Sequence, residues 1–191
     1  MFKNKFLAIF SIVLLILLIL IKINIFTEPF LEANNYPNVY YINLKHRTDI
    51  IKHFLKQLNY INYPSNKIIR IDAVQNNIGT LGCLASHIKA LKKGLNDGND
   101  FCIILEDDFT FIESLSVTDI NKTLIDCFNS DVKWNVILLS MSGELLENQN
   151  KNNLLLNIKH SQTTSGYIIK KTYIPVLLKL FTDLYRITKN Y

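Results

Sequence analysis

The sequence predicts an α/β domain built on one mixed sheet whose strands are mostly parallel. Three observations lead to this fold class. Strand-like and helix-like segments alternate along most of the chain, which is the order typical of helices packed against a parallel sheet. The run Phe101–Leu105 is apolar at every position, as expected of a strand buried on both faces. Residues 80–95 carry apolar side chains at helical spacing, which predicts an amphipathic helix.

The N-terminal region predicts a membrane anchor. Residues 6–26 are almost wholly apolar and approach the roughly 20 residues that a helix needs to span a bilayer. A cleaved signal peptide is the competing interpretation, but the stretch exceeds the usual apolar length of roughly 7 to 15 residues and no small-x-small cleavage site follows it. Lys3 and Lys5 favour a cytosolic location for residues 1–5. This predicts a single-pass type II membrane protein, located in the ER or Golgi if the source is eukaryotic or viral.

The rest of the chain predicts a short stem and one domain. Residues 27–37 form the polar stem, and residues 38–191 are an ordinary length for a single domain. Cys83, Cys102 and Cys127 show no CxxC spacing, so neither a disulfide framework nor a structural zinc site is predicted, although one pair could bridge in an oxidising lumen. The basic residues behind the net charge of +5 are scattered and no nucleic-acid motif is present, which argues against nucleic acid as a partner.

The strands are predicted from short β-rich or continuously apolar runs between turn-forming residues. A polar loop is expected where the chain reads MSGELLENQNKNN, residues 141–153. Strands are expected, in chain order, at residues 39–44, 67–74, 101–105, 134–140, 154–159 and 165–170.

The helices are predicted from apolar side chains that recur every three or four residues. Thr48 and Thr80 are placed as N-caps of the first two helices, and Pro175 is tolerated in the first turn of the last. On the second helix, His87 flanks the apolar stripe and Ser86 faces nearly opposite to it. Helices are expected at residues 48–58, 80–95, 118–129 and 172–187.

Three consecutive carboxylates, Glu106, Asp107 and Asp108, follow the buried run of the third strand. Crowded carboxylates raise the cost of ionising one another, so they are favoured where a cation balances them. Parallel sheets bind ligands at the carboxyl ends of their strands. On an extended segment Glu106 and Asp108 project to one side and Asp107 to the other, which makes Glu106 and Asp108 the predicted ligands of Mn²⁺ or Mg²⁺. A solvated acidic turn remains the alternative for a lone triplet.

Four stretches of the sequence together resemble glycosyltransferase family 25, which includes lipooligosaccharide and procollagen galactosyltransferases. The likeness covers roughly residues 38–175, and spaced matches of this kind are more specific than any one motif. The stretches are VYYINLKHRTDI at residues 39–50, IDAV at 71–74, GTLGCLASHIKAL at 79–91 and FCIILEDDF at 101–109.

This resemblance implies a fold and a reaction. The implied fold is the GT-A type, a nucleotide-binding sandwich. The implied reaction moves a sugar, commonly galactose in this family, from a UDP-sugar to a hydroxyl of a glycan or protein. A bound Mn²⁺ or Mg²⁺ would clamp the donor's diphosphate. The fold alone does not establish this reaction, so the evidence for it has to come from the residues of the site.

The resemblance also implies which residues form the site. Arg47 could pair with phosphate and Asn43 with the base or ribose, while His87 alone would more often be a hydrogen-bonded core residue. A general base is left unassigned, although Glu144 is placed as though it could enter the site. The candidate catalytic residues are Asp107, Asp108 and His87. The candidates for binding the donor are Asn43, Arg47, Asp72, Gly82, Ser86 and Glu106.

The chain ends at Tyr191, sooner than the family pattern leads one to expect. Either the enzyme is unusually compact, or the chain keeps only the donor half and a partner chain completes the domain. The alternative function is therefore a catalytically inactive, membrane-tethered protein that binds a nucleotide sugar, a glycan or a companion transferase. Another metal-dependent phosphate enzyme is a weaker third hypothesis.

Overall fold

The computed structural model describes residues 36–112, 114–129, 132–146 and 154–190. The segments at 1–5 and 6–26 and nearly all of the stem lie outside these residues, so the predicted membrane anchor stays a prediction. Among the described residues, none of the helices combines the length and apolar character needed to cross a bilayer.

The centre of the domain is a mixed sheet of five strands in the order β2-β1-β3-β7-β4. Strand β1 pairs in parallel with both β2 and β3, and β7 runs antiparallel to its neighbours β3 and β4. The predicted α/β class with a mixed sheet is thus confirmed. The strands are β1 (Val39–Asn43), β2 (Ile68–Asp72), β3 (Phe101–Glu106), β4 (Val136–Leu138) and β7 (Gly166–Lys170).

A second, two-stranded antiparallel sheet joins β5 (Gly143–Leu145) to β6 (Ile158–Ser161). The prediction of a polar loop over residues 141–153 was wrong for the part that forms β5. Strand β5 is short and largely exposed, so it lacks the hydrophobic pattern that reveals a strand in sequence, whereas β6 overlaps the end of the strand predicted at 154–159. The two segments are strands because they pair with each other through backbone hydrogen bonds.

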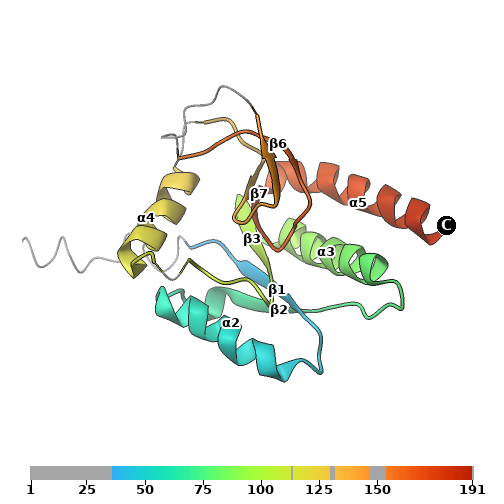
Figure 1. Cartoon of the computed structure of the whole chain (residues 1–191), viewed down its shortest axis with the longest axis horizontal. Coiled ribbons are helices and arrows are strands. Elements are labelled where there is room, and N and C mark those ends of the chain that lie inside the picture. The colour runs from blue at the N-terminus through green and yellow to red at the C-terminus, as the bar shows by residue number, and fades with distance from the viewer. Residues whose placement is uncertain (1–35, 113, 130–131, 147–153, 191) are drawn as a thin grey trace, which may run out of the picture. The chain divides into compact units, whose positions relative to one another are not determined.

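Helices cover both faces of the large sheet (Figure 1). Helices α3 and α5 pack against each other and against one face, while α2 and α4 lie on the other. Two 3₁₀ turns, Ser65–Lys67 and Lys171–Tyr173, precede β2 and α5. The helices are α2 (Thr48–Tyr60), α3 (Gly79–Asn96), α4 (Val117–Phe128) and α5 (Ile174–Lys189).

The side chains of β1 show how the sheet is buried on both faces. Tyr40 and Ile42 belong to the core beneath α3 and α5. Tyr41 points to the opposite face, where its ring centroid lies 4.9 Å from that of Phe54 on α2. Every residue of β1 is buried. Because helices close both faces, the ends of the strands are where a ligand can approach the sheet.

The helix starts differ from the predicted caps. Thr48 and Thr80 lie inside the first turns of α2 and α3, and the capping positions are Arg47 and Ile78, neither of which makes a side-chain capping bond. The turn after β1 closes one residue earlier than expected, with the Arg47 N–H donating to the Leu44 carbonyl at 2.9 Å. Helix α4 does have a capping side chain, Ser116.

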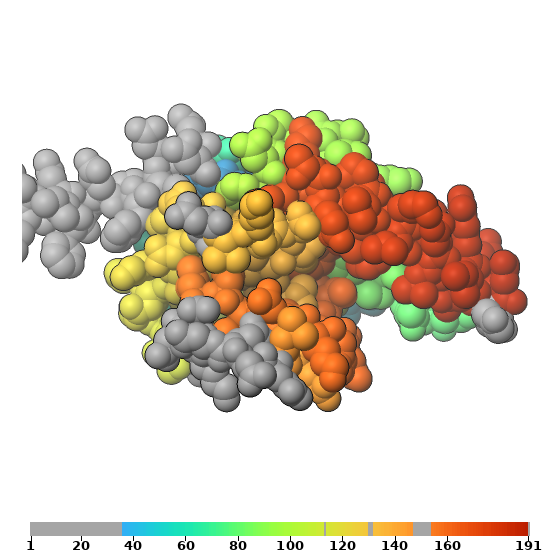
Figure 2. Space-filling model, turned by 90° about the horizontal axis from the view of Figure 1, so that it is seen from above, coloured from blue at the N-terminus to red at the C-terminus, as the bar shows by residue number. Residues whose placement is uncertain are grey.

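The outer face of α5 exposes a stripe of apolar side chains. Helix α5 lies along the surface of the domain (Figure 2, red). Its inner face packs on the core, whereas the outer stripe is about half exposed. An apolar surface of this kind is where a partner chain could bind, and the partner itself stays a prediction. The stripe consists of Val176, Leu180, Leu184 and Ile187.

Candidate functional site

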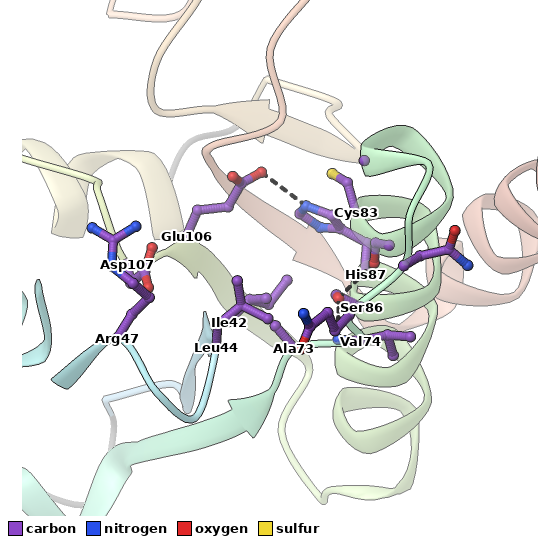
Figure 3. Close-up of a pocket in the computed structure, with 14 residues that line it drawn as sticks. Ile42, Leu44, Arg47, Ala73, Val74, Cys83, Ser86, His87, Glu106 and Asp107 are labelled. Carbon is purple, nitrogen blue, oxygen red and sulfur yellow. Dashed lines mark hydrogen bonds and ion pairs between the residues drawn. The ribbon is translucent and has the colours of Figure 1, made fainter.

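A cavity of about 250 Å³ lies where the parallel strands β1, β2 and β3 end, beside the first turns of α3. Figure 3 shows side chains from the sheet edge and from α3 facing each other across it. The polar side chains that line it include Arg47, Ser86, His87, Glu106 and Asp107. The cavity therefore gathers most of the residues that the sequence places in a site, and it lies at the predicted edge of the sheet.

The acidic triplet does not continue β3 as an extended segment. The Phe109 N–H donates to the Glu106 carbonyl at 3.1 Å, so the chain turns directly after the strand. Glu106 and Asp107 consequently both line the cavity, whereas Asp108 is exposed and does not line it. The predicted alternation, with Glu106 and Asp108 on one side, was wrong beyond Glu106 because the turn rotates each later side chain.

Asn43, the last residue of β1, fixes the position of Asp107. Its buried side chain donates from Nδ2 to Asp107 Oδ2 at 2.6 Å and to the Arg47 carbonyl at 3.2 Å. Its Oδ1 accepts hydrogen bonds from Arg70 Nε at 3.1 Å and Nη2 at 3.0 Å. A side-chain amide has two donor hydrogens and two acceptor lone pairs, and all are used here. Asn43 thus positions other site residues, and it has no bonding capacity left for the predicted contact with a base or ribose.

Arg47 and Asp72 lie differently with respect to the cavity. Arg47 lines it with a side chain that is 44% exposed, and its guanidinium pairs with Asp49 at 3.2 Å. Asp72 does not line the cavity, and its carboxylate, 61% exposed, pairs with Arg70 Nη1 at 2.6 Å. Arg47 therefore brings a cation next to the carboxylates, while Asp72 ends β2 as an ion-pair partner.

His87 and Glu106 form an ion pair in the wall of the cavity. His87 Nε2 lies 3.1 Å from Glu106 Oε1, and His87 Nδ1 lies 3.1 Å from the Tyr167 hydroxyl. Burial lowers the pKa of His87, but the hydrogen bonds with the Cys83 thiol and with Glu106 outweigh it and raise the pKa to about 9. The bond from His87 in turn lowers the pKa of Glu106. At neutral pH the pair is imidazolium and carboxylate.

Ser86 and Gly82 join α3 to the loop that follows β2. Ser86 Oγ accepts a hydrogen bond from the Val74 N–H at 2.8 Å and donates to the Gly82 carbonyl at 2.7 Å. A Cβ on Gly82 would lie 2.7 Å from the Val74 carbonyl oxygen, so glycine allows this close approach. Ser86, predicted to face nearly opposite to the apolar stripe of α3, is nevertheless buried, because the loop after β2 covers it.

Three residues support the site without having been predicted. Arg70 holds Asn43, the Tyr167 hydroxyl bonds His87, and the Thr164 hydroxyl bonds Glu106. An arginine inside the apolar strand IIRID is a signal that could have revealed Arg70, but nothing in the sequence distinguishes the other two. Glu144 lies on β5, pairs with Lys159 at 3.3 Å and does not line the cavity. It therefore gains no support as a general base.

The chemistry of the triplet fits a divalent cation. Although Asp108 is exposed, partial desolvation of its carboxyl group raises its pKa, and the neighbouring charges of Glu106 and Asp107 raise it further. A cation would relieve this crowding of negative charge, and carboxylate oxygens are the ligands that Mg²⁺ and Mn²⁺ prefer. Glu106, Asp107 and Asp108 are thus the residues that could hold such an ion.

An α/β sheet with charged side chains gathered at the carboxyl ends of parallel strands is typical of proteins that bind nucleotides or phosphates. The family model of glycosyltransferase family 25, described as an LPS biosynthesis protein, matches residues 65–189. The chain belongs to glycosyltransferase family 25, as the resemblance indicated. The match runs from the 3₁₀ turn before β2 to the end of α5 and includes the acidic triplet, whereas Asn43 and Arg47 precede it. A search of curated proteins gives no match to the chain.

Proposed function

We propose that this family 25 chain is a metal-dependent glycosyltransferase that moves a sugar from a UDP-sugar to a hydroxyl of a glycan or protein. The observation that carries the proposal is the placement of Glu106, Asp107 and Arg47 around one cavity at the carboxyl ends of β1, β2 and β3. The fold would be the GT-A type. The description of the family as LPS biosynthesis proteins favours a glycan acceptor, and the galactosyltransferases that the chain resembles favour galactose.

The donor's diphosphate has two sources of positive potential at this cavity. Arg47 supplies a guanidinium that can bind phosphate oxygens through two parallel hydrogen bonds. Helix α3 begins at Gly79 in the cavity lining, and Ile78 at its capping position makes no side-chain capping bond. The N–H groups of a first helical turn and the helix dipole both favour an anion at that position. These features support diphosphate binding between Arg47 and α3.

The cation would be Mn²⁺ or Mg²⁺, held by Glu106 and Asp107, which line the cavity, with Asp108 beside them in the same turn. When bound, it would neutralise the diphosphate and stabilise the charge that develops on the departing nucleotide. The protein's own contribution is to fix the carboxylates in advance. Asn43 holds Asp107 at 2.6 Å, and His87 holds Glu106 at 3.1 Å.

A donor screen on the purified full chain tests the proposal. Release of nucleotide diphosphate is measured for a panel of nucleotide sugars, with and without Mn²⁺. We expect one donor to be turned over in a metal-dependent way, and both Asp107→Asn and Asp108→Ala to abolish it. Asp100→Asn is the matched control, because Asp100 is exposed at the amino end of β3 and should leave turnover unchanged.

The screen also separates the proposal from its alternative. Donor binding without turnover, under every acceptor and metal condition, would favour a catalytically inactive binding protein. If no donor is bound or turned over, the proposed glycosyltransferase function is excluded.

A further inference from the structure

One group of side chains in the described part of the chain combines sulfur, nitrogen and oxygen ligands. The ligand atoms of Cys83, His87 and Glu106 all lie within 4.8 Å of one another. Cys83 and His87 are separated by four positions on α3, so they project from the same face of that helix. Glu106 reaches them from the end of β3, and Figure 3 shows the three side chains converging at one side of the cavity.

We propose that Cys83, His87 and Glu106 bind a transition-metal ion of the zinc class, with a further coordination position open to the cavity. This site differs from the oxygen-ligand cation site proposed above and does not depend on glycosyl transfer. The two proposed sites have Glu106 in common, and an ionised carboxylate has two oxygens with which to serve them.

The set of donor atoms determines which ion fits. Thiolate, imidazole and carboxylate are ligands of zinc, and three protein ligands with an open position are the pattern of zinc sites that bind water or substrate. Mn²⁺ and Mg²⁺ prefer oxygen, so the sulfur of Cys83 selects against them. Zinc–ligand bonds of about 2.0 to 2.3 Å place tetrahedral ligand atoms about 3.5 Å apart. His87 Nε2 and Glu106 Oε1 are already 3.1 Å apart, and all three ligand atoms lie within 4.8 Å of one another, so a small side-chain movement would bring them to this spacing.

The surroundings of His87 resemble those of a metal ligand. Its ring is 2% exposed, and its Nδ1 meets the hydroxyl of Tyr167, which is equally buried. Imidazole ligands usually donate their second N–H to a fixed acceptor, which sets the tautomer and the ring orientation. Here the Tyr167 hydroxyl fills that role and leaves Nε2 directed towards Glu106. Tyr167 would therefore be a positioning residue for the ion.

An ion can reach the site from solvent. Cys83 is exposed and lines the cavity, while His87 is held in place in the wall behind it. His87 and Glu106 are thus held by their hydrogen bond before the ion arrives, and the third ligand, Cys83, is accessible from solvent. Cys102 and Cys127 are buried elsewhere in the core, so they cannot substitute for Cys83.

Cobalt titration of the full chain, without any nucleotide sugar, tests the site. Co²⁺ takes the place of zinc and gives a sulfur-to-metal charge-transfer band only when a thiolate binds it. We expect this band to saturate at one ion per chain, to disappear when Zn²⁺ is added, and to be lost in Cys83→Ser. Tyr167→Phe should retain the band but weaken the affinity by about 10- to 100-fold.

Two further variants make the result decisive. Asp108→Ala should keep the cobalt spectrum, because Asp108 belongs to the other proposed cation site, and Cys127→Ser should keep it as a thiol control. A band that persists in Cys83→Ser, or the absence of any band in wild-type protein shown to be folded by circular dichroism, would overturn the proposal. Because no donor is present, neither outcome depends on whether the chain transfers sugar.

Discussion

Asn43 Nδ2 donates a hydrogen bond of 2.6 Å to Asp107 Oδ2 and thereby joins the end of β1 to the turn after β3. The two residues are far apart in sequence, and the amide that links them is buried. Since Arg70 binds the other end of the same amide, a chain of polar contacts runs across three neighbouring strand ends. This chain of contacts fixes one carboxylate of the acidic triplet before any ligand arrives.

Replacing Asn43 should therefore destabilise the domain as well as the site. Asn43→Ala removes the buried amide that bonds Asp107 and Arg70, and each hydrogen bond lost costs about 0.5 to 1.5 kcal/mol. Urea unfolding measures the loss in free energy of unfolding. Asn96→Ala, at the exposed end of α3, is the control and should change it little. Equal small effects of the two substitutions would show that the buried amide does not hold the strand ends together.

Gly82 and Gly79 provide a matched pair of substitutions on α3. In Gly82→Ala the new Cβ would lie 2.7 Å from the Val74 carbonyl oxygen, so the backbone has to move, at a cost of about 1 to 3 kcal/mol. In Gly79→Ala the Cβ meets nothing within 4 Å, and alanine favours a helix by about 1 kcal/mol. Thermal unfolding should show a lower Tm for the first variant and an unchanged or higher Tm for the second. The reverse order would contradict the close packing of the loop on α3.

Asp97 should make the domain sensitive to acid. Burial opposes ionisation of this carboxylate, but hydrogen bonds from Tyr40 and Asn38 and the charge of Lys93 outweigh it and hold its pKa below the ordinary value of 3.8. A carboxylate with a lowered pKa stabilises the fold above its unfolded pKa, and this stabilisation is lost as the pH falls through the folded pKa.

The measurement is the free energy of unfolding from neutral pH down to about pH 3. Asp97→Asn should be less stable than wild type at neutral pH, and the difference should shrink as the solution is acidified. Asp100→Asn, an exposed neighbour, should follow the wild-type curve. Parallel curves for wild type and Asp97→Asn would mean that Asp97 does not titrate differently on folding.

The sequence was sufficient where local pattern decides the structure. Phe101–Leu105 is a strand buried on both faces, as its continuous apolar character predicted. The second helix, predicted at 80–95, forms as α3. Its apolar spacing could not show that Ser86 is also buried, because that burial comes from the loop after β2 folding back onto the helix. Packing between distant segments is not encoded in the period of one helix.

The sequence predicted most of the residues of the site but not their arrangement in space. The acidic triplet was identified from local sequence, but the turn that sends Glu106 towards His87 and Asp107 towards Asn43 depends on contacts with α3 and β1. The cysteine pattern gave no sign of the proposed metal site, because its three side chains come from one turn of a helix and the end of a strand. Such convergence becomes visible only when the sheet is assembled.

The reactivity of Cys83 tests most directly whether the cavity binds the donor. Cys83 is the exposed thiol of the three cysteines and lines the cavity, so the rate at which iodoacetamide alkylates it reports whether the cavity is occupied. With Mn²⁺ present throughout, mass spectrometry should show that rate falling towards zero as the proposed UDP-sugar donor is raised to saturation, and Asp107→Asn should weaken the protection. An alkylation rate that no nucleotide sugar changes, in folded wild-type protein, would place the donor elsewhere and contradict the assignment of this cavity.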